Sequence, residues 1–219
     1  MTAFALPAKT QTKLGEMADL RLARHTGRQW QDLPASVQSR FLKYIGPKAC
    51  AVYTGQVRAC RRNLAGSILA HLLQLIGAPL PLDYTSKDQP AAVTITRDAK
   101  TGGQIWSRQY NRRRGVPQII HSVKAFAGPT GLEERIGAGF AMSLRLEVVG
   151  GALLFKSAGY RWRFLGLDLA LPTWLAPGDL TVGHHPLDDT RFEFTLDLIH
   201  PWFGELLHQR ILFHDTQEA

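Results

Sequence analysis

From residue 90 onward, apolar and polar residues alternate along most of the chain. The alternation is clear in residues 93–96, 106–110, 142–148 and 191–198. A period of two is typical of strands that bury one face. Glycine-rich and proline-rich turns separate these segments, and two further strands are expected at 51–57 and 205–213. Together the segments predict about nine strands, and their short connections favour antiparallel neighbours.

The first third of the chain shows a helical pattern instead. Residues 64–76 place leucine or isoleucine at every fourth position, Asn63 precedes them as an N-cap, and Gly77 follows as a stop. This spacing predicts the main helix, with Leu64, Ile68, Leu72 and Ile76 on its apolar stripe. Shorter helices are expected at 12–23 and 35–44.

A single main helix is too small to cover the apolar faces of so many strands. The sheet must therefore curl on itself to bury them. The expected fold class is α+β, mostly β: a curled antiparallel sheet or partly open β-barrel, with one main helix and N-terminal helices. The interior of such a barrel is either filled by side chains or holds one small ligand, and the pattern leaves both open.

The domain organisation follows from the same patterns. We expect residues 1–32 to form an N-terminal extension, partly helical or mobile, because they are mostly polar and weakly patterned. Residues 33–214 are expected to form a single globular domain, and 215–219 a tail.

The net charge of +8 is concentrated near the N-terminus. Residues 33–82 carry six Lys or Arg and no Asp or Glu, whereas residues 83–219 are neutral. The basic segment is either a solvated surface or a docking site for an acidic partner. Nucleic acid is disfavoured as a partner. Arg161 and Arg163 alternate with Trp162 and therefore lie on the opposite face of the strand, whereas a protein that binds single-stranded nucleic acid carries its basic and aromatic residues on the same face.

Localisation rests on what the chain contains. Its apolar runs are too short for a bilayer span, and its first residues do not follow the pattern of a secretory signal. The two cysteines, Cys50 and Cys60, are too few to stabilise a chain of 219 residues by disulfides. We therefore expect a cytoplasmic protein.

The strand pattern also places polar residues where they can meet a ligand. Trp106, Arg108 and Tyr110 share one strand face, and Glu134 and Arg135 lie on a nearby strand. An inward Arg108 needs a buried partner, and Glu134 is the candidate. Such an arginine either holds the carboxylate or phosphate of an otherwise apolar ligand, or forms a structural ion pair.

His200 is a further candidate ligand-binding residue. Pro201, Trp202, Phe203 and Gly204 follow it and predict a sharp bend at the sheet edge. Beside a cleft, this imidazole can act as an acid or base, whereas in a turn it fixes the bend by a hydrogen bond.

The motifs of several other sites are missing. The eight histidines form no metal-binding pattern, because adjacent His184 and His185 face opposite sides of a strand. There is no Gly-x-Ser-x-Gly nucleophile motif, and Gly137-Ala138-Gly139 lacks the third glycine of a dinucleotide-binding loop. We therefore expect no metal and no cofactor.

Several segments resemble a known family in their order and spacing. They are Leu33-Pro34, Trp106–Tyr110, Leu132–Gly137, Gly159–Pro177 and His200–Gly204. Over residues 33–214 the chain is similar to the bacterial domain of unknown function 4166 family. The resemblance implies a bacterial domain that occurs alone or joined to other modules, including reductase-like nucleotide-binding ones. It implies no activity and no catalytic residues.

The sequence therefore favours a non-catalytic domain that holds a small apolar or amphipathic ligand inside a curled sheet, or packs as an accessory module. Its expected ligand-binding residues are Trp106, Arg108, Tyr110, Glu134, Arg135 and His200. Two alternatives stay open. One is an enzyme of unrecognised type that uses His200 and Glu134, and the other is a basic interaction protein that docks on nucleic acid or an acidic partner.

Overall fold

The computed structural model describes residues 19–75, 77 and 80–215, in which eleven strands form one sheet. The strands are β1 (Cys50–Arg62), β2 (Pro90–Arg97), β3 (Gln104–Tyr110), β4 (Gln118–Ala125), β5 (Glu133–Gly137), β6 (Phe140–Val149), β7 (Ala152–Phe164), β8 (Leu167–Ala170), β9 (Asp179–Pro186), β10 (Arg191–His200) and β11 (Gly204–Asp215). Every pair of neighbouring strands is antiparallel.

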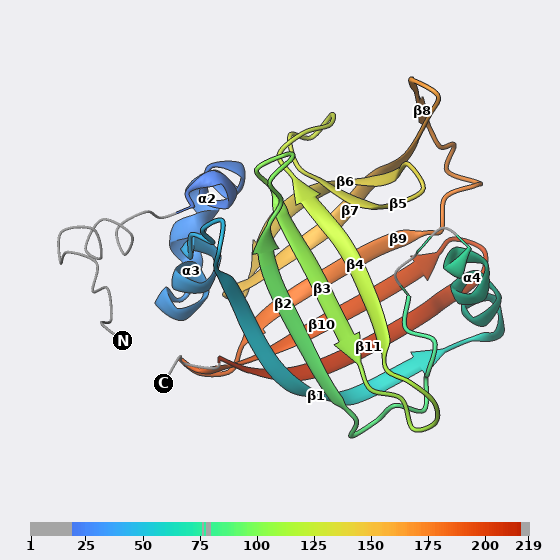
Figure 1. Ribbon diagram of the computed structural model, residues 1–219, viewed down its shortest axis with the longest axis horizontal. Helices are drawn as coiled ribbons and strands as arrows, with labels where there is room; N and C mark the ends of the chain where they lie inside the picture. Colours follow the sequence, from blue (N-terminus) through green and yellow to red (C-terminus); the bar gives the residue numbers. More distant parts are fainter. Residues whose placement is uncertain (1–18, 76, 78–79, 216–219) are drawn as a thin grey trace, which may run out of the picture.

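Ten of these strands close into a barrel (Figure 1). The sheet runs in the order β6-β5-β4-β3-β2-β1-β11-β10-β9-β7, and the pairing of β6 with β7 joins its two ends. Strand β8 pairs only with the far end of β7 and stands outside the closed wall. The predicted mostly-β fold with a curled antiparallel sheet is confirmed. Closure removes the two open sheet edges and buries the alternating apolar positions.

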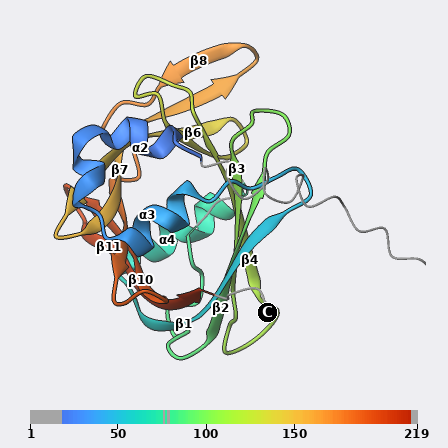
Figure 2. The same cartoon turned by 90° about the vertical axis from the view of Figure 1, so that its left-hand side faces the viewer.

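Short helices lie at the two ends of the barrel. Helix α2 (Arg21–Thr26), the 3₁₀ helix η1 (Gly27–Asp32) and α3 (Ala35–Leu42) lie at one end, which faces the viewer in Figure 2. Helix α4 (Leu64–Gln74) packs on β11 at the other end. The predicted helix 12–23 falls largely outside the described residues. No helix of the described chain is long and apolar enough to cross a membrane.

Helix α4 is present as predicted, but it turns the other face to the barrel. Asn63 caps it, its side chain accepting a hydrogen bond from the Gly66 N–H at 2.7 Å. The predicted stripe is wrong in part: Leu64, Ile68 and Leu72 are exposed, whereas Leu69 and Leu73, which widen the stripe, pack against the core. The buried positions of the helix are Gly66 and Ala70, and Ile76 lies outside the described residues. The reason is the close approach of the helix to β11. A Cβ on Gly66 would lie 2.0 Å from the carbonyl oxygen of Leu206, so the small residues face the strand.

The buried apolar side chains form two clusters. One fills the barrel from β1 and β2 across to β10 and β11, and the other joins α2, η1 and α3 to β6 and β7. Leu22 and Trp30, from the predicted extension, are buried in the second cluster beside Val37 and Phe41. The described part of the extension, residues 19–32, is therefore packed against the barrel end. The division of the chain at residue 32 stays a prediction.

Candidate ligand-binding site

A cavity of about 50 Å³ lies inside the barrel at the α3 end. Its walls are mainly aromatic and aliphatic, and include Phe41 from α3, Tyr53 from β1, Trp106 from β3 and Phe192 from β10. A single buried water needs about 10–15 Å³ on this measure, so the cavity has room for a few waters. It is smaller than the pockets of ~300 Å³ or more that usually hold drug-sized ligands. A larger ligand therefore fits only if the lining side chains move.

The polar part of the cavity wall is basic. Arg40 and Lys43 contribute from α3 and the residue that follows it, Lys124 from the end of β4, and His184 from β9. Gln104 supplies an amide. No carboxylate is among the lining residues that the structure describes. The cavity is therefore an apolar space with cationic side chains at its margin, and it has no acidic group to repel an anion.

Four polar side chains from β3, β4 and β5 form a buried network, and one of them, Lys124, belongs to the cavity wall. The Glu134 carboxylate accepts hydrogen bonds from Arg108 at 3.0 Å, Ser122 at 2.5 Å and Lys124 at 2.9 Å. Arg108 also donates to Ser122 at 3.0 Å. All four residues are buried. The predicted inward Arg108 and its ion pair with Glu134 are confirmed.

The network contains two basic side chains for one carboxylate. Burial alone would raise the pKa of Glu134, but the cations of Lys124 and Arg108 hold it far below its usual range. Burial lowers the pKa of Lys124, although Glu134 opposes that effect. Trp106 lies within cation–π distance of both bases, 4.4 Å from Lys124 Nζ and 5.7 Å from Arg108 Cζ to the ring centroid. Arg108, Lys124 and Glu134 therefore form one buried polar cluster beside the cavity, with Trp106 against both bases.

Arg40 anchors α3 to the strand ends. Its side chain is 5% exposed, and its Nε donates to Asp215 Oδ2 at 2.5 Å. Its Nη2 donates to the Asp189 carbonyl oxygen at 3.0 Å. The third nitrogen, Nη1, is buried and has no hydrogen-bond partner among the described residues. Since Arg40 lines the cavity, one donor of a fixed guanidinium is left over at its wall.

His184 is the second unpartnered polar group of the cavity. It is 6% exposed, and neither ring nitrogen has a hydrogen-bond partner within the described chain. Its ring stacks on Phe192 at 4.2 Å and meets the edge of Phe41 at 5.1 Å. Burial, with a further contribution from the Arg40 cation, lowers the pKa of His184 to about 3. The imidazole is therefore neutral near pH 7 and offers one donor and one acceptor.

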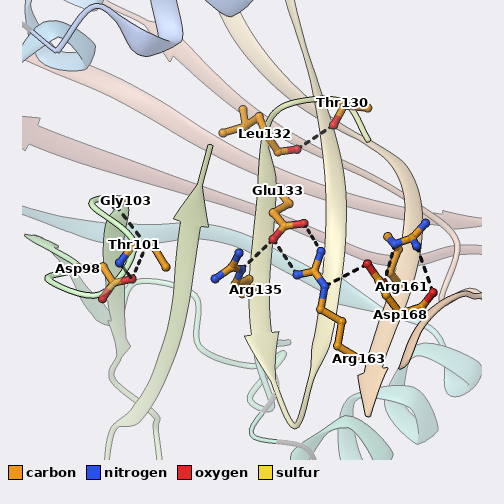
Figure 3. Close-up of polar contacts among 10 residues, drawn as sticks. All are labelled: Asp98, Thr101, Gly103, Thr130, Leu132, Glu133, Arg135, Arg161, Arg163 and Asp168. Atoms are coloured by element: carbon orange, nitrogen blue, oxygen red, sulfur yellow. Dashed lines mark hydrogen bonds and ion pairs between the residues drawn. The ribbon is translucent and has the colours of Figure 1, made fainter. Parts of the chain in front are cut away.

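Arg135 is not brought into the interior. It alternates with Glu134 and therefore points outward, where its Nε donates to Glu133 at 2.7 Å. Arg163 from β7 donates two hydrogen bonds of 2.8 Å to the same Glu133 carboxylate. Asp168 from β8 forms ion pairs with Arg161 and Arg163 (Figure 3). This outer cluster ties β5, β7 and β8 together. Glu133 and Glu134, which are adjacent in β5, therefore point to opposite sides of the wall.

The remaining predicted residues lie away from the cavity wall. Tyr110 is buried in the barrel core, where burial raises its pKa to about 12. His200 ends β10, and its Nδ1 accepts a hydrogen bond from the Trp202 N–H at 3.2 Å. It is therefore a turn-fixing residue in this structure, and it packs against Trp202 and Phe203. Of the six predicted residues, only Trp106 lines the cavity, while Arg108 and Glu134 lie behind it.

The other sites considered from sequence gain no support. Among the described residues, no group of three or more His, Cys, Asp or Glu side chains is arranged to hold a metal ion. Cys60 lies at the border of the core, and burial raises the pKa of its thiol to about 11, so it is not an activated nucleophile.

Sequence reasoning missed most of the cavity wall, including its polar residues Arg40, Lys124 and His184. Each of these three has a signal in the sequence. Lys124 shares its strand face with Ile120 and Ser122, and Arg40 lies three residues after Val37 on a short amphipathic helix. His184 was considered only as a metal ligand. Its parity in β9 places it with Val182, which also lines the cavity.

A family model described as "Domain of unknown function (DUF4166)" matches residues 33–213. The match covers α3 and all of the barrel except the last two residues of β11, and it leaves out α2 and η1. No curated protein and no solved structure matches the chain.

Proposed function

Because the chain belongs to the DUF4166 family, whose function is unknown, we propose from its architecture that it binds a small, largely apolar ligand without transforming it. The observation that supports this proposal is the cavity inside a closed barrel, with aromatic walls and a few polar groups at one end. Ligand sites in proteins commonly have this composition. The size of the cavity favours a short ligand, or one that displaces the long side chain of Lys43.

The enzyme alternative is less well supported. Its two residues, Glu134 and His200, have separate hydrogen-bond partners, and neither lines the cavity. The acidic-partner alternative also loses strength, because Arg40 is buried and bonded to Asp215, and Arg62 bonds to Ser67 and Pro81. A cytoplasmic location stays a prediction from the sequence, because Cys50 and Cys60 lie ten residues apart on one strand and could not pair with each other in any compartment.

The first test is native mass spectrometry of the freshly purified chain. We expect a mass excess from a small molecule that is lost on denaturation and recovered in an organic extract. A second test applies to protein stripped of ligand, and titrates it with straight-chain alcohols from butan-1-ol to dodecan-1-ol while two-dimensional NMR follows the backbone amides. Binding in the barrel predicts saturable shifts in residues around Trp106 and Tyr53.

A matched pair of variants makes the titration specific. Ala51 lines the cavity, whereas its neighbour Val52 faces outward and is 40% exposed. Ala51→Leu fills the cavity and should abolish saturable binding, while Val52→Leu should leave it unchanged. Equal binding by both variants, or no binding of any alcohol by the stripped wild-type protein, would refute the proposed function.

A further inference from the structure

The polar groups at the cavity wall are chemically one-sided. Three cationic side chains, Arg40, Lys43 and Lys124, line it, and none of the described lining residues is a carboxylate. Arg40 pairs with Asp215 and Lys124 pairs with Glu134, but neither of these carboxylates lines the cavity. A ligand that enters this space therefore meets a positive potential with no acidic counterpart.

Two of the groups are also incompletely bonded. Arg40 Nη1 and both ring nitrogens of His184 are buried without a hydrogen-bond partner among the described residues. Buried polar atoms in proteins nearly always have a partner, so these mark a position where another polar group belongs. Both side chains are held firmly, Arg40 by Asp215 and by stacking over Phe192 at 4.7 Å, and His184 by the same ring. They are fixed donors, which suits the recognition of a ligand group.

We propose that the cavity recognises the carboxylate of an apolar monocarboxylic acid, through Arg40 Nη1 and a ring N–H of His184. This inference rests on the proposed function and names its ligand class. One carboxylate oxygen accepts from the guanidinium and the other from the imidazole, so two buried donors are satisfied by one group. The apolar remainder of the acid lies against the aromatic wall formed by Tyr53, Trp106 and Phe194.

The neutral state of His184 is consistent with this assignment. A neutral imidazole donates one hydrogen bond and adds no charge, so the carboxylate keeps its charge-assisted hydrogen bond to the Arg40 guanidinium. A neutral ligand such as an alcohol satisfies at most part of this arrangement. The acid and the alcohol of the same chain length are therefore the natural probes.

The experiment compares hexanoate with hexan-1-ol on the ligand-stripped full chain at pH 7.5, by NMR titration. We expect hexanoate to bind about tenfold or more tightly than hexan-1-ol, as a charge-assisted hydrogen bond implies. Arg40→Gln should weaken hexanoate about tenfold and leave hexan-1-ol unchanged. His184→Phe, which keeps the aromatic packing, should weaken hexanoate selectively by a smaller factor.

Two controls keep the outcome decisive. Arg210→Gln removes an arginine that pairs with Glu193 on the outside of the barrel, and should change neither affinity. If Arg40→Gln fails to fold, as judged by circular dichroism, His184→Phe alone carries the test. Equal affinity for the two wild-type ligands, or equal weakening of both by the variants, overturns the carboxylate assignment while the proposed function stands. Failure of both probes to bind overturns the two together.

Discussion

Glu133 and Glu134 are neighbours in β5, and both are buried, but they face opposite sides of the barrel wall. Glu134 lies in the interior with Arg108, Ser122 and Lys124, all of them buried. Glu133 lies in the outer cluster, where Arg135 and Arg163 keep 38% and 31% of their side chains exposed. The comparison shows that two buried carboxylates can have different environments. The difference between them is whether the side chains that pair with the carboxylate are exposed to water.

This difference has energetic consequences. The partners of Glu133 are hydrated when the pair is broken, whereas the bases around Glu134 are left without water. Breaking the inner network should therefore cost more stability than breaking the outer one. The inner network also supplies Lys124 to the cavity wall, whereas none of Glu133, Arg135 and Arg163 lines the cavity.

The largest effect is expected for Glu134→Gln. It leaves Arg108 and Lys124 buried with no carboxylate, and should lower the free energy of unfolding by about 3–5 kcal/mol. Urea denaturation followed by circular dichroism measures the loss. A second variant, Glu134→Gln with Lys124→Met, removes one of the orphaned cations and should recover part of the stability. A loss below about 1 kcal/mol for the single variant would contradict the idea that the inner pair is dry.

The pH dependence of stability examines the other buried interior group, His184. Its pKa falls from an unfolded value near 6.5 to about 3 in the folded protein because of burial. Between these values the unfolded chain binds a proton that the native state does not, so stability declines as the pH falls. The contribution is at most about 1.4 kcal/mol for each pH unit.

We expect His184→Phe to flatten the decline in stability between pH 6.5 and 4.5, measured by urea denaturation at several pH values. Glu134 is present in both proteins, so its protonation, with an unfolded pKa near 4.3, affects the two pH profiles equally. His185→Phe is the matched control, since this neighbouring side chain contacts Thr195 on the outer face instead. A pH profile of His184→Phe that is parallel to that of the wild type would disprove the assignment.

A smaller effect is expected for Glu133→Gln on the outer side of the wall. The amide keeps some of the hydrogen bonds to Arg135 and Arg163, and the arginines remain partly hydrated, so the loss should be about 1–2 kcal/mol. Because these partners reach solvent, added salt should reduce the difference from wild type. The same denaturation series at low and high salt checks both points. A loss as large as that of Glu134→Gln would remove the distinction between the two networks.

Much of the architecture was predictable from local patterns. Alternation from residue 90 onward placed the strands, and the shortage of helical cover required the sheet to close, as β6 and β7 show. The pair of Arg108 and Glu134 was predictable as well, because an inward arginine demands a carboxylate on a neighbouring strand. These inferences succeed because strand parity and burial are properties of short segments.

The cavity was not predictable because it depends on contacts between distant segments. Arg40 meets Asp215 across 175 positions, and its guanidinium also bonds to the Asp189 carbonyl and lies over the Phe192 ring. The strand pattern left open whether the barrel is filled or hollow. That outcome depends on how the side chains of α3 fit over the barrel end, which no single segment encodes.

The smallest effect is expected on α4, whose two faces repeat the contrast between inside and outside. Ile68 is 55% exposed, so Ile68→Gln should change the free energy of unfolding by no more than about 0.5 kcal/mol. Gly66→Ala on the opposite face is the matched substitution, and should cost several times more because its Cβ meets the Leu206 carbonyl. Thermal and urea denaturation of the two variants compare the faces directly. A loss for Ile68→Gln equal to that for Gly66→Ala would mean that the leucine and isoleucine stripe is covered in solution, as its spacing first suggested.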